Sequence, residues 1–198
     1  MEDLESVKSA AKDFLSKEKK LNVLFNNAGV MAAPTHLLTK QNYDLQFGVN
    51  VVAHYLFTKL LTPALENTDD ARVVHTSSLM QNMVKHPKGI DFDEVKDCDV
   101  RRNRKLDTWK LYGYSKIGNT VIANIFNQQQ QNVSHSSCHP GIHDTGLQRH
   151  MDSRLPTYTI TWMLYPPSYG ALTQLRLGTE PGETKGNVSL IDLNNKLN

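Results

Sequence analysis

The chain has 198 residues, a hydrophobic content of 39%, a charged content of 21% and a formal net charge of +2. This length supports one domain with a sizeable buried core, so residues 1–198 are expected to fold as a single domain. The small net charge argues against nucleic acid as the main partner, because nucleic-acid-binding domains concentrate basic residues.

Cysteine usage and hydropathy favour a cytoplasmic protein. Cys98 and Cys138 are the two cysteines, which are too few for a disulfide framework and suit a reducing compartment. We find no apolar stretch as long as a membrane span, and the first residues do not resemble a signal peptide. The basic run from Arg101 to Lys105 lies in a polar stretch, and we expect it to be a solvated loop.

The first half of the chain alternates helical and strand patterns. Apolar residues at helical spacing predict a helix over residues 3–19. A short apolar run at residues 22–25 predicts a strand that stops at Asn26. Residues 41–65 then predict a long helix, and residues 71–76 predict a second strand.

The second half continues the alternation after a polar interval. Residues 82–107 are polar and charged, and we expect them to lie outside the core. Residues 111–128 predict a helix, and residues 133–138 predict a weak third strand that is broken by Pro140-Gly141. Three further features are expected: an apolar patch at residues 160–164, a helix around residues 169–177 and a short strand near residues 188–191.

Strands that alternate with helices of a dozen or more residues predict an α/β fold, with a parallel sheet and helices on both faces. In such sheets, ligands bind at the carboxyl ends of the strands. Three polar or turn-forming groups follow strand ends here: Asn26–Gly29, Ser77-Ser78 and Pro140-Gly141. We therefore expect these groups to meet in one composite site.

Tyr112 and Lys116 are four residues apart in a predicted helix, so their side chains share one face. An ammonium this close favours the phenolate, and we expect Lys116 to lower the pKa of Tyr112 so that it acts as an acid or base near neutrality. Ser78 would hold a substrate oxygen, and Asn50 would anchor a water that resupplies protons to the lysine. These side chains suit hydroxyl/carbonyl redox chemistry with hydride from a nicotinamide.

Neighbouring residues have simpler interpretations. Tyr114 misses the four-residue spacing and is expected to pack in the core, while Ser77 is expected to make a hydrogen bond at the strand end. His139 and His143 lack the carboxylate or cysteine partners of a metal site, so no metal is expected. Taken alone, Asn26–Gly29 also fits an ordinary turn.

Five segments carry a resemblance to a known family. In chain order they are Asn26-Asn27-Ala28-Gly29, Gly48-Val49-Asn50-Val51, Val74-His75-Thr76-Ser77-Ser78, Tyr112-x-x-x-Lys116 and His139-Pro140-Gly141-Ile142-His143-Asp144-Thr145. In this order and at this spacing they resemble the short-chain dehydrogenase/reductase family, most of all its retinol-dehydrogenase-like and fungal members. Residues 89–93 also resemble that branch. One segment alone would be weak evidence, whereas five in order are specific.

The resemblance implies a role for each matching residue. Ser78 corresponds to the catalytic serine, Tyr112 to the general acid/base, Lys116 to its partner and Asn50 to the relay asparagine. The remaining matches imply cofactor contacts: Asn27, Ala28 and Gly29 on the adenosine side of the dinucleotide, Ile142 and Thr145 near the nicotinamide amide, and Tyr112 and Lys116 as well.

Members of this family begin with a strand, a glycine-rich turn and a helix that hold the pyrophosphate of the cofactor. No glycine precedes Gly29 in this sequence. By resemblance, we expect a truncated Rossmann-like parallel sheet that lacks this first cofactor-binding segment, and weak or no turnover by this polypeptide. The residues that select the cofactor would also be missing, so NADP or NAD is expected.

Without that segment, the strand at residues 22–25 would be an apolar edge, which invites pairing with another chain. Three interpretations stay open: a shortened oxidoreductase, a catalytically silent remnant, or an interaction module that uses the exposed sheet edge. The patch at residues 160–164 would line a substrate pocket, touch a lipid surface or belong to the core. A small lipophilic carbonyl or alcohol is the expected substrate, and the helices at residues 41–65 and 111–128 would form a homodimer interface by resemblance.

Overall fold

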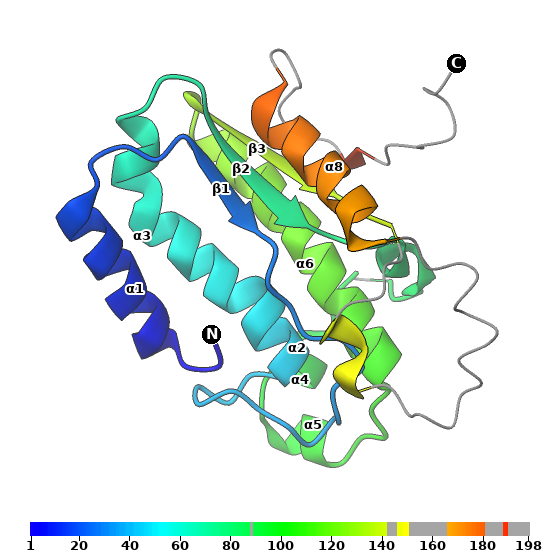
Figure 1. Cartoon of the computed structure of the whole chain (residues 1–198). Helices are drawn as coiled ribbons and strands as arrows, with labels where there is room; N and C mark the ends of the chain where they lie inside the picture. The colour runs from blue at the N-terminus through cyan, green and yellow to red at the C-terminus, as the bar shows by residue number, and fades with distance from the viewer. Residues whose placement is uncertain (88, 142–145, 151–165, 181–187, 190–198) are drawn as a thin grey trace, which may run out of the picture.

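The computed structural model describes residues 1–87, 89–141, 146–150, 166–180 and 188–189, and the structural statements below concern these residues. They form a parallel sheet in the order β1-β2-β3-β4 (Figure 1). The strands are β1 (Val23–Asn26), β2 (Ala71–Thr76), β3 (Val133–Cys138) and β4 (Val188–Ser189). The predicted α/β fold with a parallel sheet is thus confirmed.

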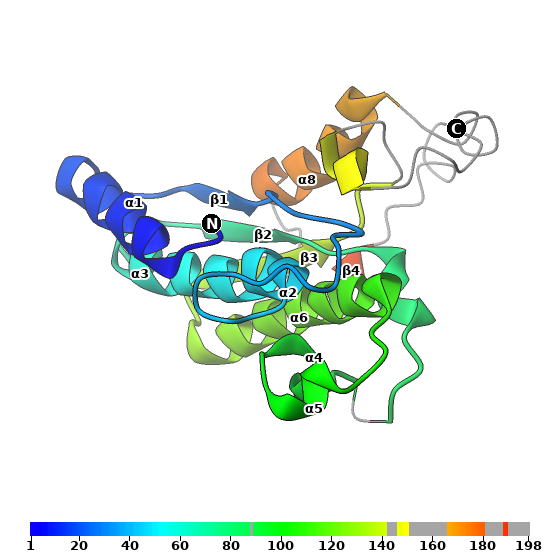
Figure 2. The ribbon, with the colours of Figure 1, turned by 90° about the horizontal axis from the view of Figure 1, so that it is seen from below.

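Helices cover both faces of the sheet. On one face, α1 (Leu4–Lys17), α3 (His54–Glu66) and α6 (Thr108–Gln129) lie side by side (Figure 1). On the other face, α8 (Pro167–Thr179) crosses the strands, as the view from below shows (Figure 2). The two layers sandwich β2, of which all six residues are buried. No described helix has the length and apolar character that crossing a membrane requires.

The core follows the two-residue alternation of the strands. On the side of α1 and α3, the buried cluster contains Ala11, Leu24, Leu61, Leu65, Ala71, Val73 and Val133. On the opposite side, Val74 and Cys138 pack against Leu177 of α8. Helices α1, α3 and α8 each turn an apolar face toward the sheet, because each covers one face of the same strands.

The helix predicted over residues 41–65 begins later than expected. Asp44 caps its N-terminus by accepting a hydrogen bond from Phe47 N at 3.0 Å. A short α-helix, α2 (Leu45–Phe47), leads into a π-helical segment (Gly48–Ala53) and then into α3. A π-helical turn has no signature in the apolar spacing of the sequence, so the periodicity could not reveal it.

The polar interval at residues 82–107 is only partly outside the core. It contains two short helices, α4 (Phe92–Val95) and α5 (Asp99–Arg102), and it buries Val95. Arg101 is 4% exposed and donates hydrogen bonds to Thr35 O at 2.7 Å and to Glu94 O. It also pairs with Asp44 at 3.3 Å. The prediction of a solvated loop is therefore wrong at Arg101, because hydrogen-bond acceptors surround its guanidinium. Residues 102–105 are exposed as predicted, although Arg102 still belongs to α5.

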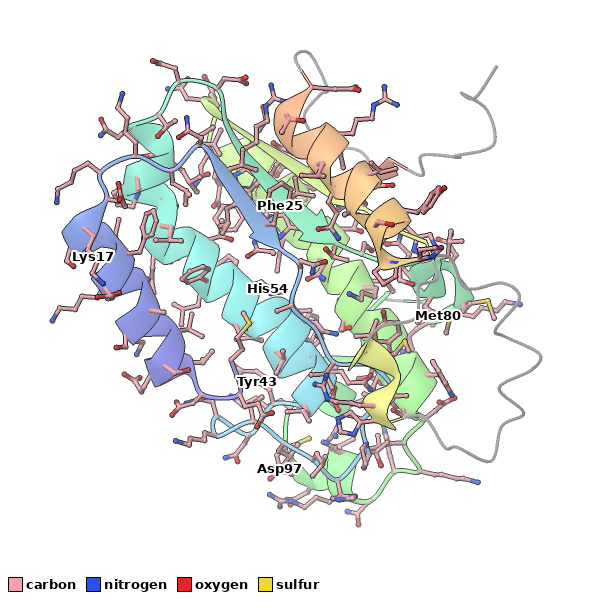
Figure 3. All side chains as sticks on the ribbon, in the orientation of Figure 1. Lys17, Phe25, Tyr43, His54, Met80 and Asp97 are labelled. Atoms are coloured by element: carbon pink, nitrogen blue, oxygen red, sulfur yellow. The ribbon has the colours of Figure 1, made fainter. Side chains whose placement is uncertain are left out.

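Strand β1 is an edge of the described sheet, as expected, because it pairs with β2 alone. Phe25 is 38% exposed and lies between β1 and α8 (Figure 3). Helix α8 approaches this strand closely, since a Cβ atom on Gly178 would lie 2.6 Å from Phe25 Cζ. The predicted helix around residues 169–177 corresponds to α8, and the predicted strand near residues 188–191 to β4. The patch at residues 160–164 lies outside the described residues.

Candidate active site

The carboxyl ends of β1, β2 and β3 border a cavity of about 470 Å³. Its lining includes the predicted site residues Asn27, Ala28, Gly29, Ser78, Tyr112 and Lys116, together with Thr76, Ser77, His139, Pro140, Gly141, Gly146, Leu147, Pro167, Gly170, Ala171 and Gln174. The prediction that the groups following three strands meet in one site is therefore confirmed. A larger hollow of about 520 Å³, lined by residues 32–35 and 105–108, contains none of these side chains.

Helix α6 carries Tyr112 and Lys116 into the cavity. Asp107 caps this helix by accepting a hydrogen bond from Trp109 N at 2.8 Å. Gly113 then permits a close approach, because a Cβ atom there would lie 2.2 Å from Val84 Cγ2 and 3.1 Å from the main-chain oxygen of Met80. This contact brings α6 against the turn that follows Ser78, and so brings the phenol next to the serine.

Lys116 is held at the end of β2. Its Nζ atom donates a hydrogen bond to Thr76 O at 2.8 Å, and Asn119 Nδ2 donates to the same oxygen at 2.8 Å. Burial lowers the pKa of Lys116 to about 8, because a buried ammonium loses its hydration. The ammonium lies 5.4 Å from the centre of the Tyr112 ring. The predicted shared face of the two side chains is confirmed.

Tyr112 is 3% exposed, and this burial raises its pKa to about 12, while a hydrogen bond with the Ser78 side chain acts in the lowering direction. The expected shift of the Tyr112 pKa toward neutrality is therefore wrong for this state of the protein, because the net shift is upward. The physical reason is that loss of water around the phenol outweighs the other influences, and Lys116 donates to Thr76 instead.

The two serines after β2 have different contacts, as expected. Ser77 is buried and donates a hydrogen bond to Lys116 O at 2.8 Å, which ties β2 to α6. Ser78 caps the short 3₁₀ turn at residues 79–83 by accepting a hydrogen bond from Met80 N at 3.3 Å. Ser78 also lines the cavity, and its side chain forms a hydrogen bond with that of Tyr112. Tyr114 is fully buried in the core, as predicted.

Asn50 lies behind the cavity rather than in its lining. Its side chain accepts a hydrogen bond from Val30 N at 2.8 Å and donates to Val30 O at 2.9 Å and to Ser115 Oγ at 3.0 Å. Its main-chain oxygen lies 2.9 Å from His54 Nδ1. Gly29 leaves room for this amide, since a Cβ atom there would lie 3.2 Å from Asn50 Oδ1. The Asn50 side chain thus connects the loop after β1 to helix α6 through hydrogen bonds to Val30 and Ser115, and this connection is called the Asn50 bracket below.

Asn27 makes a contact that spans 147 residues of sequence. Its Oδ1 atom accepts hydrogen bonds from Gln174 Nε2 of α8 at 2.7 Å and from Thr76 Oγ1 at 3.2 Å. Sequence reasoning did not identify Gln174, because nothing near it in the chain indicates that α8 reaches the end of β1. The predicted contacts Ile142 and Thr145 lie outside the described residues, as does His143.

No group of three His, Cys, Asp or Glu side chains gathers as a metal site within the described ranges. The polar side chains that line the cavity supply an ammonium, a phenol, hydroxyls, carboxamides and the imidazole of His139. Such a set can bind hydroxyl and carbonyl oxygens and move a proton to or from one of them.

Comparisons with known proteins find similarity to short-chain dehydrogenases. A family model described as short chain dehydrogenase matches residues 1–88. The chain is similar to a short-chain dehydrogenase/reductase of Armillaria gallica, at 46% identity over 191 residues that cover 93% of this chain and 60% of that protein. It is also similar to retinol dehydrogenase 13 of Homo sapiens, at 32% identity over 161 residues that cover 80% of this chain and 46% of that protein. The chain thus spans less than two thirds of either relative.

A solved structure has the same fold. It is that of a candidate short chain dehydrogenase from Escherichia coli complexed with NADPH, with a TM-score of 0.63 and 20% identity, covering 92% of this chain and 68% of that chain. At this level of identity the similarity concerns the fold alone, and it agrees with a Rossmann-like arrangement of strands and helices.

Proposed function

We propose that this chain, which is similar to short-chain dehydrogenases/reductases over the part of the fold that it spans, carries the catalytic portion of an oxidoreductase that interconverts a carbonyl and an alcohol with NADP or NAD. The observation that carries this proposal is the cavity in which Ser78, Tyr112 and Lys116 meet.

Tyr112 is the proton donor in the reducing direction. Its raised pKa of about 12 keeps the phenol protonated at neutral pH, so it can give a proton to the substrate oxygen and take one back in the reverse direction. The Ser78 hydroxyl donates a hydrogen bond to the same oxygen and fixes its position. The Lys116 ammonium, one helical turn away, stabilises the phenolate that remains. A bound nicotinamide supplies the hydride.

The residues present fit part of a dinucleotide. A lysine ammonium has three hydrogens, and Thr76 O accepts one of them among the described residues, so the others are available to ribose hydroxyls. Asn27, Ala28 and Gly29 also line the cavity. Asn50 supports both sides by bridging the loop after β1 and helix α6. In this proposal Asn50 is a positioning residue rather than a proton relay.

The finer assignments follow from the surroundings of the cavity. Ala28, Leu147 and Ala171 line it together with two prolines, which supports a small lipophilic carbonyl or alcohol as the substrate. Cys98 and Cys138 are free thiols, which supports a cytoplasmic location. Exposed apolar side chains on α6, Trp109, Val121 and Ile125, support a homodimer through this helix.

The test is a fluorescence titration of the purified chain with NADPH and NADH, followed by turnover assays with aliphatic and aromatic aldehydes and ketones. We expect saturable binding, and Tyr112→Phe should lower kcat by about 10²–10⁴-fold without weakening cofactor binding. Tyr114→Phe is the matched control, because Tyr114 lies on the same helix but packs in the protein core and does not line the cavity.

Two outcomes would separate this function from the silent remnant. A folded wild-type chain that binds neither cofactor would overturn the proposal and favour the remnant. Binding without turnover of any carbonyl, at saturating cofactor, would favour a protein that has kept the cavity but lost catalysis.

A second candidate function is favoured by the edge of β1. This strand pairs on one side only among the described residues, and its Phe25 is 38% exposed. Edge strands with apolar neighbours pair readily with other chains. Light scattering of the wild type and of Phe25→Lys would test this function: loss of a concentration-dependent complex in the variant would support it, and identical monomers would exclude self-association through this edge.

A further inference from the structure

Helix α8 contributes a carboxamide to the cavity from a distant part of the sequence. Gln174 lines the cavity and donates from Nε2 to Asn27 Oδ1 at 2.7 Å. The helix is anchored beneath Gln174 by Thr173 and Leu177, which are buried against the sheet. On the same helix, Gly178 packs against Phe25 of β1. Packing therefore fixes the main chain at Gln174, and the hydrogen bond to Asn27 orients its carboxamide.

The contact determines which atoms Asn27 presents to a ligand. Asn27 Oδ1 accepts two hydrogen bonds, from Gln174 Nε2 and from Thr76 Oγ1 at 3.2 Å, so both of its lone pairs are used. The amide is thereby oriented with Nδ2 as its remaining polar atom. Asn27 itself is exposed at the rim of the cavity, so this donor faces solvent or a ligand.

Gln174 presents the complementary atom. Its Oε1 atom has no hydrogen-bond donor among the residues that the structure describes, while its Nε2 is used by Asn27. The two carboxamides together offer one donor, Asn27 Nδ2, and one acceptor, Gln174 Oε1. The pair carries no charge.

This pattern selects a class of ligand group. A phosphate has acceptor oxygens only and would be opposed by the Gln174 oxygen, whereas binding of anions relies on N–H donors and positive charge. A hydroxyl both donates and accepts, so neighbouring hydroxyls match one donor beside one acceptor. In NAD both riboses carry such a pair of hydroxyls, whereas in NADP the nicotinamide ribose carries it and the adenosine ribose keeps its 3′-hydroxyl beside the 2′-phosphate.

We propose that Gln174 is a dinucleotide-binding residue of this chain, in which its carboxamide and that of Asn27 bind ribose hydroxyls. This inference rests on the proposed function, since it takes the cavity to be a dinucleotide site. The ribose is the adenosine ribose or the nicotinamide ribose, and these two sources are separated by using each half of the cofactor as a probe.

The experiment compares the wild type with Gln174→Met, which keeps the length of the side chain and removes the carboxamide. Binding of NADPH is followed by fluorescence, and binding of AMP, which contains the adenosine ribose alone, and of reduced nicotinamide mononucleotide, which contains the nicotinamide ribose alone, by calorimetry. Leu175→Ala is the control, because Leu175 is an exposed neighbour on the same helix. Thermal unfolding of each variant verifies that α8 remains docked.

We expect Gln174→Met to weaken NADPH binding about fivefold to tenfold, the usual effect of losing one neutral hydrogen bond. The same loss should appear with the one half-cofactor that contains the bound ribose. Asn27→Ala should give a similar loss, and the double variant should lose less than the product of the two, because the carboxamides act together.

Three results would overturn the inference. Unchanged affinity of Gln174→Met for NADPH and for both halves would exclude a binding role. Tighter binding by this variant would mean that the Gln174–Asn27 contact closes the site instead of forming it. If the folded wild type binds none of the three probes, the proposed function and this inference fail together, whereas binding by the wild type with no effect of Gln174→Met removes this inference alone.

Discussion

Lys116 Nζ and the Thr76 main-chain oxygen are joined by a hydrogen bond of 2.8 Å at the carboxyl end of β2. A buried ammonium with a single carbonyl partner is poorly compensated for the water that it has lost. This is the physical reason for the lowered pKa of Lys116, about 8, and it makes the protonation of this one side chain measurable in the stability of the fold.

The free energy of unfolding should rise with pH between about 8 and 9. An unfolded lysine keeps its proton up to a pKa of 10.5, whereas folded Lys116 loses it near 8, so the unfolded state binds more protons in this interval and stability increases. The gain is about 1 kcal/mol across this pH unit. Urea unfolding should show the slope in the wild type, its absence in Lys116→Met and its retention in Lys12→Met. An unchanged slope in Lys116→Met would exclude Lys116 as its source.

The free energy of unfolding should stop rising above about pH 9. Burial raises the pKa of the Cys138 thiol from 9.0 to about 12, so folded Cys138 keeps a proton that the unfolded chain loses. This opposes Lys116 because the folded state then binds more protons. Cys138→Ala should extend the rising limb above pH 9, as measured by the same unfolding series.

Asn50→Ala should destabilise the fold by about 2–4 kcal/mol. The substitution leaves the main-chain N–H and C=O of buried Val30 without partners, and each buried unsatisfied group costs free energy. Asn50→Asp should not rescue stability, since a carboxylate cannot donate to Val30 O. Asn103→Ala, at an exposed position, is the control for denaturant unfolding. If Asn50→Ala lowers the free energy of unfolding by less than about 0.5 kcal/mol, the Asn50 bracket does not stabilise the fold as proposed.

Two neighbouring arginines should respond differently to removal of their charge. Arg101→Met should cost about 3–5 kcal/mol of stability, because it leaves the buried Asp44 carboxylate without its partner. Arg102→Met should cost less than about 1 kcal/mol, because Arg102 pairs with Asp97 and Asp99 at the surface. Denaturant unfolding measures both. Equal losses would contradict the burial of Arg101, and Asp44→Asn should recover part of the loss in the Arg101 variant.

Three buried histidines should make the fold sensitive to acid. Burial lowers the pKa of His54 to about 4, that of His135 to about 4 and that of His75 well below its usual value of 6.5. Between pH 4 and 6.5 the unfolded state therefore binds more protons, and stability falls as the pH falls. His135→Gln should reduce the proton uptake on unfolding at pH 5 by about one proton.

The pH dependence of the free energy of unfolding measures this uptake. His36→Gln, at an exposed position, is the control and should leave the uptake unchanged. An uptake that is the same in His135→Gln as in the wild type would mean that His135 is already protonated in the folded chain.

The sequence predicted the parts of the fold that depend on local patterns. The periodicity of α1, α6 and α8 was sufficient because each packs one apolar stripe on the sheet. The sequence also predicted that the side chains of Ser78, Tyr112 and Lys116 lie together, because the carboxyl ends of parallel strands share one edge of the sheet. Their proximity in the cavity follows from topology, and topology follows from the alternation of helices and strands.

The remaining features depend on partners far away in the chain. Arg101 resembles its solvated neighbours in sequence, and its burial is explained by acceptors that include Thr35 O and the carboxylate of Asp44, 57 residues earlier. The phenol of Tyr112 has a raised pKa because surrounding residues exclude water, which the spacing to Lys116 does not reveal. Gln174 meets Asn27 only because α8 returns across the face of the sheet.

The return of α8 also sets when the cavity can exist. A nascent chain that has left the ribosome as far as β3 already contains Ser78, Tyr112 and Lys116, but it lacks the wall that Gln174 provides. The contact of highest sequence separation in the site therefore forms late, after the sheet on which α8 docks. A ligand that touches both Asn27 and Gln174 would bind only chains in which α8 has docked and would stabilise them against reopening. Occupancy of the site would then distinguish molecules with a docked α8 from those in which α8 has not yet been synthesised or has not yet docked.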